Sequence, residues 1–154
     1  ANLNDERATL GILGKGPLQG ELQNLIDEFG VSSRVKLLGT DKNPFKFIKK
    51  AQCFVCASRF EGFSNVLLEA LACERFIIST DHKSGARELL GDDEYGILTP
   101  VDDKKAMETA MRRALEDENL RRDYEKRAYG RVVKFDKNAV AAQLIGYLEG
   151  ENGE

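Results

Sequence analysis

Short apolar runs alternate with segments of helical periodicity along most of the chain. The runs predict strands over Thr9–Leu13, Arg34–Leu38, Cys53–Ala57, Phe76–Ser79 and Gly96–Leu98. The periodic segments predict helices over Leu18–Phe29, Pro44–Lys50, Ser64–Cys73, Ser84–Leu90, Lys104–Glu116, Leu120–Val133 and Lys137–Glu149. Residues 150–154 are expected to form a disordered tail. Strands that alternate with helices are typical of an α/β fold, so we expect a Rossmann-like parallel sheet with helices on both faces.

The bulk composition fits one ordinary globular domain over residues 1–154. Hydrophobic residues make up 42% and charged residues 32% of the chain, which argues against disorder. The formal net charge is −3, so no basic surface is expected to bind nucleic acid. No apolar run approaches the ~18 residues of a transmembrane helix and no signal peptide opens the chain, so we expect a cytoplasmic location.

The three cysteines are expected to be free and structural. Cys53 and Cys56 have the spacing of a redox or metal pair. They lie on a predicted strand, where side chains three positions apart point to opposite faces, so they are not expected to bind one ion. We interpret both, and Cys73, as core thiols.

Two glutamates, Glu61 and Glu69, flank the start of the helix predicted over Ser64–Cys73. Gly62 lets the backbone approach a ligand closely, and the free N–H groups at the helix start suit a phosphate or diphosphate. Glu69 shares the stripe of Asn65 and Cys73, the one face of this apolar helix with polar side chains. Its carboxylate is suited to accept hydrogen bonds from two vicinal hydroxyls, as on a ribose. A salt bridge between Glu69 and a neighbouring Arg or Lys is the alternative.

A glycine-rich loop follows the first predicted strand. Gly14 and Gly16 fit a phosphate-binding loop, and Asp41 after the next strand fits the acidic residue of a dinucleotide site. Gln19 stands where the dinucleotide pattern requires its third glycine. A simple turn with Pro17 at the first helical position explains the loop equally well.

The loop after the fourth predicted strand holds His82, the one histidine of the chain. Nothing in the spacing pairs His82 with Ser79 or Ser84 as base and nucleophile, so we do not expect a catalytic triad. We interpret the loop as a polar cover over a ligand, with Asp81 or Ser84 capping the next helix.

Four blocks of residues follow one another in the order of a known family. They are Ile12-Leu13-Gly14-x-Gly16-Pro17-Leu18, Arg34-Val35-x-Leu37-Leu38-Gly39, Ser58-Arg59-x-Glu61-Gly62-Phe63-x-Asn65-Val66-Leu67-Leu68-Glu69-Ala70, and Ser79-Thr80-Asp81 with Ser84-Gly85-x-x-Glu88. Over about residues 8–148, they resemble the C-terminal, donor-binding half of the family 4 retaining glycosyltransferases with the GT-B fold. The Glu-x7-Glu element is the most specific block.

The resemblance implies a nucleotide-sugar site. Glu69 would hold the ribose hydroxyls, and Glu61, as the catalytic candidate, would contact hydroxyls of the transferred sugar. The remaining donor-binding residues implied are the backbone amides near the diphosphate, Gly62, Phe63, Ser64 and Asn65, the lining of the nucleotide side, Gly14 and Gly16, and the neighbours of the base, Leu38 and Gly39.

The same resemblance implies sugar transfer with retained anomeric configuration and without a metal or resident cofactor. Catalysis would depend mainly on stabilisation of the departing diphosphate. The loop with Ser79-Thr80-Asp81 and Ser84-Gly85 is similar to that of enzymes that transfer sugars, often N-acetylhexosamines, from UDP-sugars to glycan or lipid-linked acceptors. The acceptor would bind through an N-terminal domain, and the first strand of this half would precede Ala1. We therefore expect a fragment of a two-domain enzyme that transfers no sugar alone, and leave open a peripheral membrane association of the whole enzyme.

Two departures from the family pattern bear on the helix that carries Glu69. Glu74 stands where the family commonly has a glycine, which puts the left-handed C-cap of that helix in doubt. Ser64 replaces a frequent proline and offers a capping hydroxyl.

Two alternative interpretations remain. One is an NAD-type oxidoreductase domain, which rests on Gly14, Gly16 and Asp41, and the other is a non-catalytic α/β interaction module.

Overall fold

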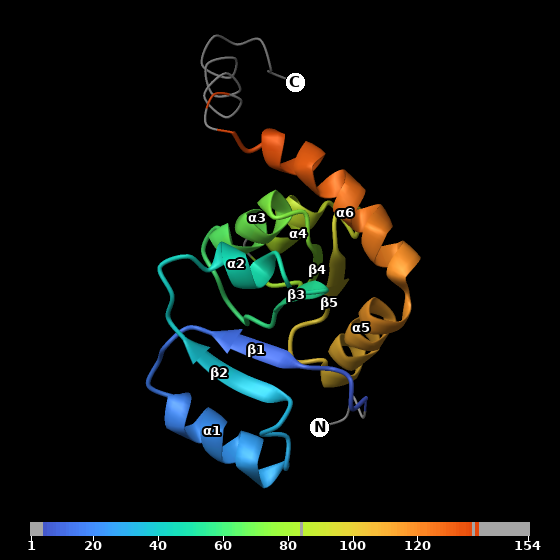
Figure 1. Cartoon of the computed structure of the whole chain (residues 1–154). Helices are drawn as coiled ribbons and strands as arrows, with labels where there is room; N and C mark the ends of the chain where they lie inside the picture. The colour runs from blue at the N-terminus through green and yellow to red at the C-terminus, as the bar shows by residue number, and fades with distance from the viewer. Residues whose placement is uncertain (1–4, 84, 137, 139–154) are drawn as a thin grey trace.

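The computed structural model describes residues 5–83, 85–136 and 138, and its elements follow the predicted order (Figure 1). The strands are β1 (Leu10–Leu13), β2 (Val35–Gly39), β3 (Cys53–Cys56), β4 (Phe76–Thr80) and β5 (Ile97–Thr99). The helices are α1 (Gln19–Glu28), α2 (Phe45–Ile48), α3 (Asn65–Ala72), α4 (Ala86–Leu90), α5 (Lys104–Glu116) and α6 (Glu118–Val133). The α/β class is thus confirmed.

All the strand pairs are parallel, as predicted, but the strands form two ladders. β1 pairs with β2, and β3, β4 and β5 pair in that order. Within the described residues no strand joins β1 to β3, so each of these two strands keeps one unpaired edge. Figure 1 shows the β1–β2 pair, in blue and cyan, lying with α1 beside the rest of the fold.

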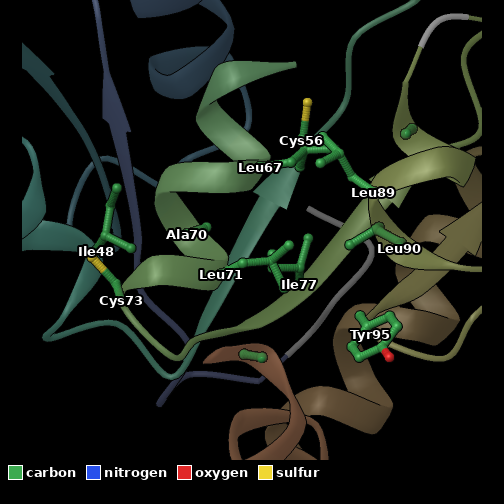
Figure 2. Close-up of a cluster of buried hydrophobic side chains, with 12 residues drawn as sticks. Ile48, Cys56, Leu67, Ala70, Leu71, Cys73, Ile77, Leu89, Leu90 and Tyr95 are labelled. Atoms are coloured by element: carbon green, nitrogen blue, oxygen red, sulfur yellow. The ribbon is translucent and has the colours of Figure 1, made fainter. Parts of the chain in front are cut away.

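Helices cover both faces of the β3–β4–β5 sheet, and β4 at its centre is buried along its whole length. Successive residues of a strand point to opposite faces. Accordingly Ile77 packs with Leu71 of α3 and Leu90 of α4 in the cluster of Figure 2, while Phe76 packs on the other face with residues of α5 and α6. Burial on both faces explains why the strand opens with three consecutive apolar residues, Phe76, Ile77 and Ile78.

The cysteine prediction is confirmed. Cys56 lies in the cluster of Figure 2, whereas Cys53 packs against the cluster on the opposite face. All three thiols are free, and Cys73 is also buried. Burial raises the pKa of the Cys53 thiol and of the Cys73 thiol, as expected for structural cysteines.

Three helix starts differ from expectation or lie partly outside the described residues. Pro17 is not the first helical residue, because a turn precedes α1 and the helix begins at Gln19. At α4 the N-cap is Gly85, in a left-handed conformation without a side-chain cap, and Ser84 lies outside the described residues. α6 begins two residues earlier than predicted because the Asp117 carboxylate caps it.

Other ends agree with expectation. Asp103 caps α5 by accepting a hydrogen bond from the Ala106 N–H at 2.9 Å. Apart from Asn138, the helix predicted over 137–149 and the tail over 150–154 lie outside the described residues.

The C-terminus of α3 adopts the left-handed turn that the sequence put in doubt. Glu74 has φ 55°, and its N–H donates to the Leu71 carbonyl at 2.9 Å. The N–H of Arg75 donates to the Ala70 carbonyl at 3.1 Å. These two bonds form a Schellman motif, which holds a residue with a Cβ atom in a conformation that glycine adopts more readily.

Candidate functional site

The loop between β3 and α3 places Glu61 through a set of side-chain contacts. The Ser58 hydroxyl donates a hydrogen bond to the Glu61 carboxylate at 2.7 Å, and Glu61 is half-buried. The Thr80 hydroxyl at the end of β4 donates to the backbone carbonyl of Ser58. Arg59 forms an ion pair with Asp102 in the β5–α5 loop at 2.8 Å. Contacts from two neighbouring strand ends therefore fix the start of this loop.

The N-terminus of α3 presents backbone donors. Among the described residues, the N–H groups of Gly62, Phe63, Ser64 and Val66 have no hydrogen-bond acceptor. The Asn65 N–H, by contrast, donates to the Phe63 carbonyl at 2.9 Å, so it is not available as the family pattern implied. Unpaired N–H groups at a helix N-terminus favour an anion.

Glu69 is the fifth of the eight residues of α3 and is half-buried. In the part of the chain that the structure describes, it has neither an ion pair nor a hydrogen bond to another side chain. The nearest basic candidate in sequence, Arg75, pairs with Glu125 at 3.4 Å instead. The salt-bridge alternative for Glu69 is thus not observed within the described residues, and its carboxylate can accept hydrogen bonds from a ligand.

The predicted glycine-rich residues come together at the ends of β1 and β2. The Gly14 N–H donates to the Gly39 carbonyl at 2.7 Å, and both glycines have positive φ. Gly16 has open space around its Cα, and the Leu38 side chain is 40% exposed. The loop after β1 and the end of β2 therefore lie side by side, joined by the hydrogen bond between Gly14 and Gly39.

Asp41, the acidic residue of the dinucleotide alternative, is already engaged. Its carboxylate pairs with Lys46 at 2.5 Å and accepts the Asn43 N–H at 2.8 Å. The Lys46 hydrogen bond lowers the pKa of Asp41. An aspartate occupied in this way is a turn-forming residue and a poor acceptor for ribose hydroxyls.

The β4–α4 loop packs on the loop that carries Glu61. A Cβ atom on Gly85 would lie 3.6 Å from the Ser64 backbone nitrogen, an ordinary van der Waals distance, so the two loops lie side by side. His82 is buried, and both of its ring nitrogens lack a hydrogen-bond partner among the described residues. The Ser79 hydroxyl donates to the Thr80 carbonyl, so it is not paired with His82 as a catalytic triad would require.

Charged residues in the same loop are tied to one another. Arg87 contacts the carboxylates of Asp81 and Asp92, and these hydrogen bonds raise its pKa further above the usual range. Asp81 therefore anchors α4 through this ion pair and does not cap it with its side chain. The sequence pattern does not predict these ion pairs, because they join positions that share no helical or strand periodicity.

A cavity of about 420 Å³ lies elsewhere, between β5 and α5. None of the predicted donor-binding residues lines it, and we place the candidate site at the loops around Glu61. Helices long and apolar enough to cross a membrane are absent from the described part of the chain.

Comparisons with known proteins identify the family. Residues 1–131 match the model of the glycosyl transferases group 1. Over 141 residues, 92% of the chain, it is 49% identical to the N-acetylgalactosamine-N,N'-diacetylbacillosaminyl-diphospho-undecaprenol 4-alpha-N-acetylgalactosaminyltransferase of Campylobacter jejuni. The chain is also 32% identical, over 87% of its own length, to a second enzyme of Campylobacter jejuni. The name of that enzyme describes an alpha-1,4-N-acetyl-D-galactosaminyltransferase acting on a glycan linked to diphospho-undecaprenol.

The fold is shared with proteins whose structures were solved in complex with UDP. HepE of Anabaena, solved in complex with UDP, superposes with a TM-score of 0.84 at 22% identity over 95% of this chain and 42% of its own. A TarM variant of S. aureus, solved with fondaparinux, alpha-GlcNAc-glycerol and UDP, also gives a TM-score of 0.84, at 20% identity over 97% of this chain and 30% of its own. At these identities the likeness concerns the fold.

The chain spans 39% and 37% of the two curated relatives, so they extend well beyond the region matched. The family match covers most of the chain and includes the whole Glu-x7-Glu element. It decides against the NAD-type and interaction-module alternatives. The chain belongs to the glycosyl transferases group 1.

Proposed function

We propose that the chain is the donor-binding part of a retaining glycosyltransferase that uses a UDP-sugar, an N-acetylhexosamine donor in particular. The observation that carries the proposal is the arrangement around α3, where unpaired amides lie between two carboxylates. The curated relatives named above transfer N-acetylgalactosamine, which supports an acetamido sugar.

Each part of the proposed donor has a matching group. The free amides of Gly62, Phe63 and Ser64 suit the diphosphate, because backbone N–H groups and the dipole of α3 favour negative charge. The Glu69 carboxylate, without an ion-pair partner in the described residues, suits the two ribose hydroxyls. Glu61 is assigned to hydroxyls of the transferred sugar.

The nucleotide base is assigned to the surface formed by Gly14, Gly16, Leu38 and Gly39. Glycines permit a flat ligand to approach the backbone, and the exposed Leu38 side chain offers an apolar contact. The Asn65 amide is left out of the diphosphate site because it is already bonded to Phe63.

In the proposed reaction the bond between the anomeric carbon and the diphosphate oxygen breaks. The acceptor oxygen bonds to the same face of that carbon and its proton is lost to the departing diphosphate. The amides at the start of α3 would stabilise the charge that develops on the diphosphate, so the proposed reaction uses neither a metal nor a resident cofactor.

A glycan or lipid-linked acceptor is assigned to a region outside this chain. Three features support a further segment: the limited coverage of the relatives, the unpaired edges of β1 and β3, and an exposed apolar stripe on α1. The stripe consists of Leu18, Leu22, Leu25 and Phe29. We propose that a preceding strand joins the two ladders, and that the whole enzyme acts in the cytoplasm, at the inner membrane face if its acceptor is lipid-linked.

A thermal-shift screen of the full-length protein with UDP, GDP, ADP and NAD tests the proposal. A ligand at about 100 times its Kd stabilises the folded state by ~2.7 kcal/mol. We expect UDP to raise the melting temperature and NAD to leave it unchanged. A shift with NAD alone, or with none of the four, contradicts the proposal.

A further inference from the structure

We propose that Ser58 is a positioning residue that orients the Glu61 carboxylate toward the transferred sugar. The inference rests on the proposed function, because it assigns how the sugar contact of that same site is held. The inference adds to the proposed function a hydroxyl that does not contact the donor. Through Glu61, this hydroxyl would increase the affinity for a UDP-sugar relative to UDP.

The direction of the hydrogen bonds around Ser58 supports this role. A serine hydroxyl has one proton, and in Ser58 it points to Oε1 of Glu61 at 2.7 Å. The Cys56 thiol lies 3.6 Å from the Ser58 oxygen and donates to it, which leaves the hydroxyl proton for the carboxylate. Because Cys56 is buried at the end of β3, this chain of contacts starts from a fixed point in the core.

The backbone of Ser58 is held independently of its side chain. The Thr80 hydroxyl donates to the Ser58 carbonyl, and Thr80 is 5% exposed at the end of β4. The next residue, Arg59, is tied to Asp102 across the β5–α5 loop. The serine oxygen therefore has a defined place relative to the sheet, from which it can fix the carboxylate.

This arrangement reduces the entropic cost of binding the sugar. A glutamate side chain loses rotamer freedom when it is immobilised. A hydrogen bond to a charged group is among the stronger ones in proteins. When the carboxylate is already oriented, less of that cost falls on the binding of the sugar. Among the described residues the Ser58 hydroxyl bonds neither to the amides at the start of α3 nor to Glu69, so we expect binding of the nucleotide alone to be little affected by its loss.

The test compares Kd values for UDP and for a UDP-sugar, by calorimetry on the full-length protein. The probe is whichever of UDP-N-acetylglucosamine, UDP-N-acetylgalactosamine and UDP-glucose binds the wild type most tightly. We expect Ser58→Ala to weaken UDP-sugar binding by about tenfold while UDP binding changes less than about twofold. Ser58→Thr, which keeps a hydroxyl, should restore most of the difference.

Two controls separate positioning from general damage. Ser32→Ala removes another serine that donates to a carboxylate, that of Asp27 at 2.8 Å, on a remote surface, and should alter neither Kd. In the background of Glu61→Ala, which removes the acceptor of the Ser58 hydroxyl, Ser58→Ala should cause little further loss.

Each outcome bears on the inference. Equal losses of UDP and UDP-sugar affinity in Ser58→Ala, or an unchanged ratio, would overturn it. If Glu61→Ala loses the sugar-dependent affinity and Ser58→Ala does not, the positioning role fails while the proposed function stands. If the wild-type protein binds no UDP-sugar, the proposed function fails and the positioning role with it.

Discussion

Replacement of Glu74 by glycine should stabilise the chain, because this residue holds a left-handed conformation at the end of α3 with φ 55°. A left-handed residue with a Cβ atom costs roughly 1–2 kcal/mol. Glycine loses about 0.5–1 kcal/mol more conformational entropy on folding than alanine does. The Glu74 side chain is exposed and forms no ion pair or side-chain hydrogen bond within the described residues, so its removal should cost little. The expected net gain is about 0.5–1 kcal/mol.

Urea and thermal unfolding of the wild-type and variant chains measure this gain. For a protein of this size, a gain of 1 kcal/mol corresponds to about 2–4 °C in melting temperature. Glu74→Ala is the matched control, since it removes the carboxylate and keeps the Cβ atom, and it should bring no gain. If the alanine and glycine variants are equally stable, backbone strain at Glu74 does not lower the stability of the chain, and the predicted gain is wrong. Donor affinity should not change, because Glu74 lies at the opposite end of α3 from Ser64.

Further predictions concern helix ends and close packing. Asp103→Ala should lower the free energy of unfolding by about 0.5–2 kcal/mol in urea titration, because it removes the carboxylate bonded to the Ala106 N–H; no change would show that the cap does not matter. Gly96→Ala should lower the free energy of unfolding by about 1–3 kcal/mol, since its Cβ atom would lie 2.9 Å from a carbonyl of β4. Gly130→Ala, inside α6 with open space around it, should raise the free energy of unfolding by about 0.5–1 kcal/mol. A more stable Gly96→Ala together with a less stable Gly130→Ala would contradict the packing at these two positions. Arg131→Lys should destabilise by about 1 kcal/mol or more, because a lysine cannot reproduce the paired hydrogen bonds of the guanidinium to carbonyls at the C-terminus of α4, and an unchanged melting temperature would exclude that role.

The elements of the sheet and its parallel pairing were accessible from sequence because they depend on local patterns. The segment Phe76–Thr80 opens with three consecutive apolar residues, and the structure buries it on both faces. The opposite orientation of Cys53 and Cys56 followed from the period of a strand alone. The separation of β1 from β3 did not follow, because pairing depends on which strands lie next to each other in space.

The candidate site was accessible only in part. The placement of Glu61 before the N-terminus of a helix and of Glu69 within that helix came from the spacing of the motif. The contacts of Arg59 with Asp102 and of Thr80 with Ser58 join residues 43 and 22 positions apart, and no local pattern reports such pairs. The burial of His82 was missed for a similar reason, since a polar loop sequence gives no sign that neighbouring elements cover it.

We propose that Glu69 holds the ribose of a uridine nucleotide, and a calorimetric comparison of UDP with 2′-deoxy-UDP on the full-length protein tests this role. We expect the wild type to bind UDP about tenfold more tightly than the deoxy analogue, because the analogue lacks one hydrogen bond to a charged group. Glu69→Gln should weaken UDP binding and narrow that difference, while Glu21→Gln, on the exposed part of α1, should change neither. A wild type that binds both nucleotides equally, or a Glu69→Gln variant that still distinguishes them as the wild type does, would contradict the account.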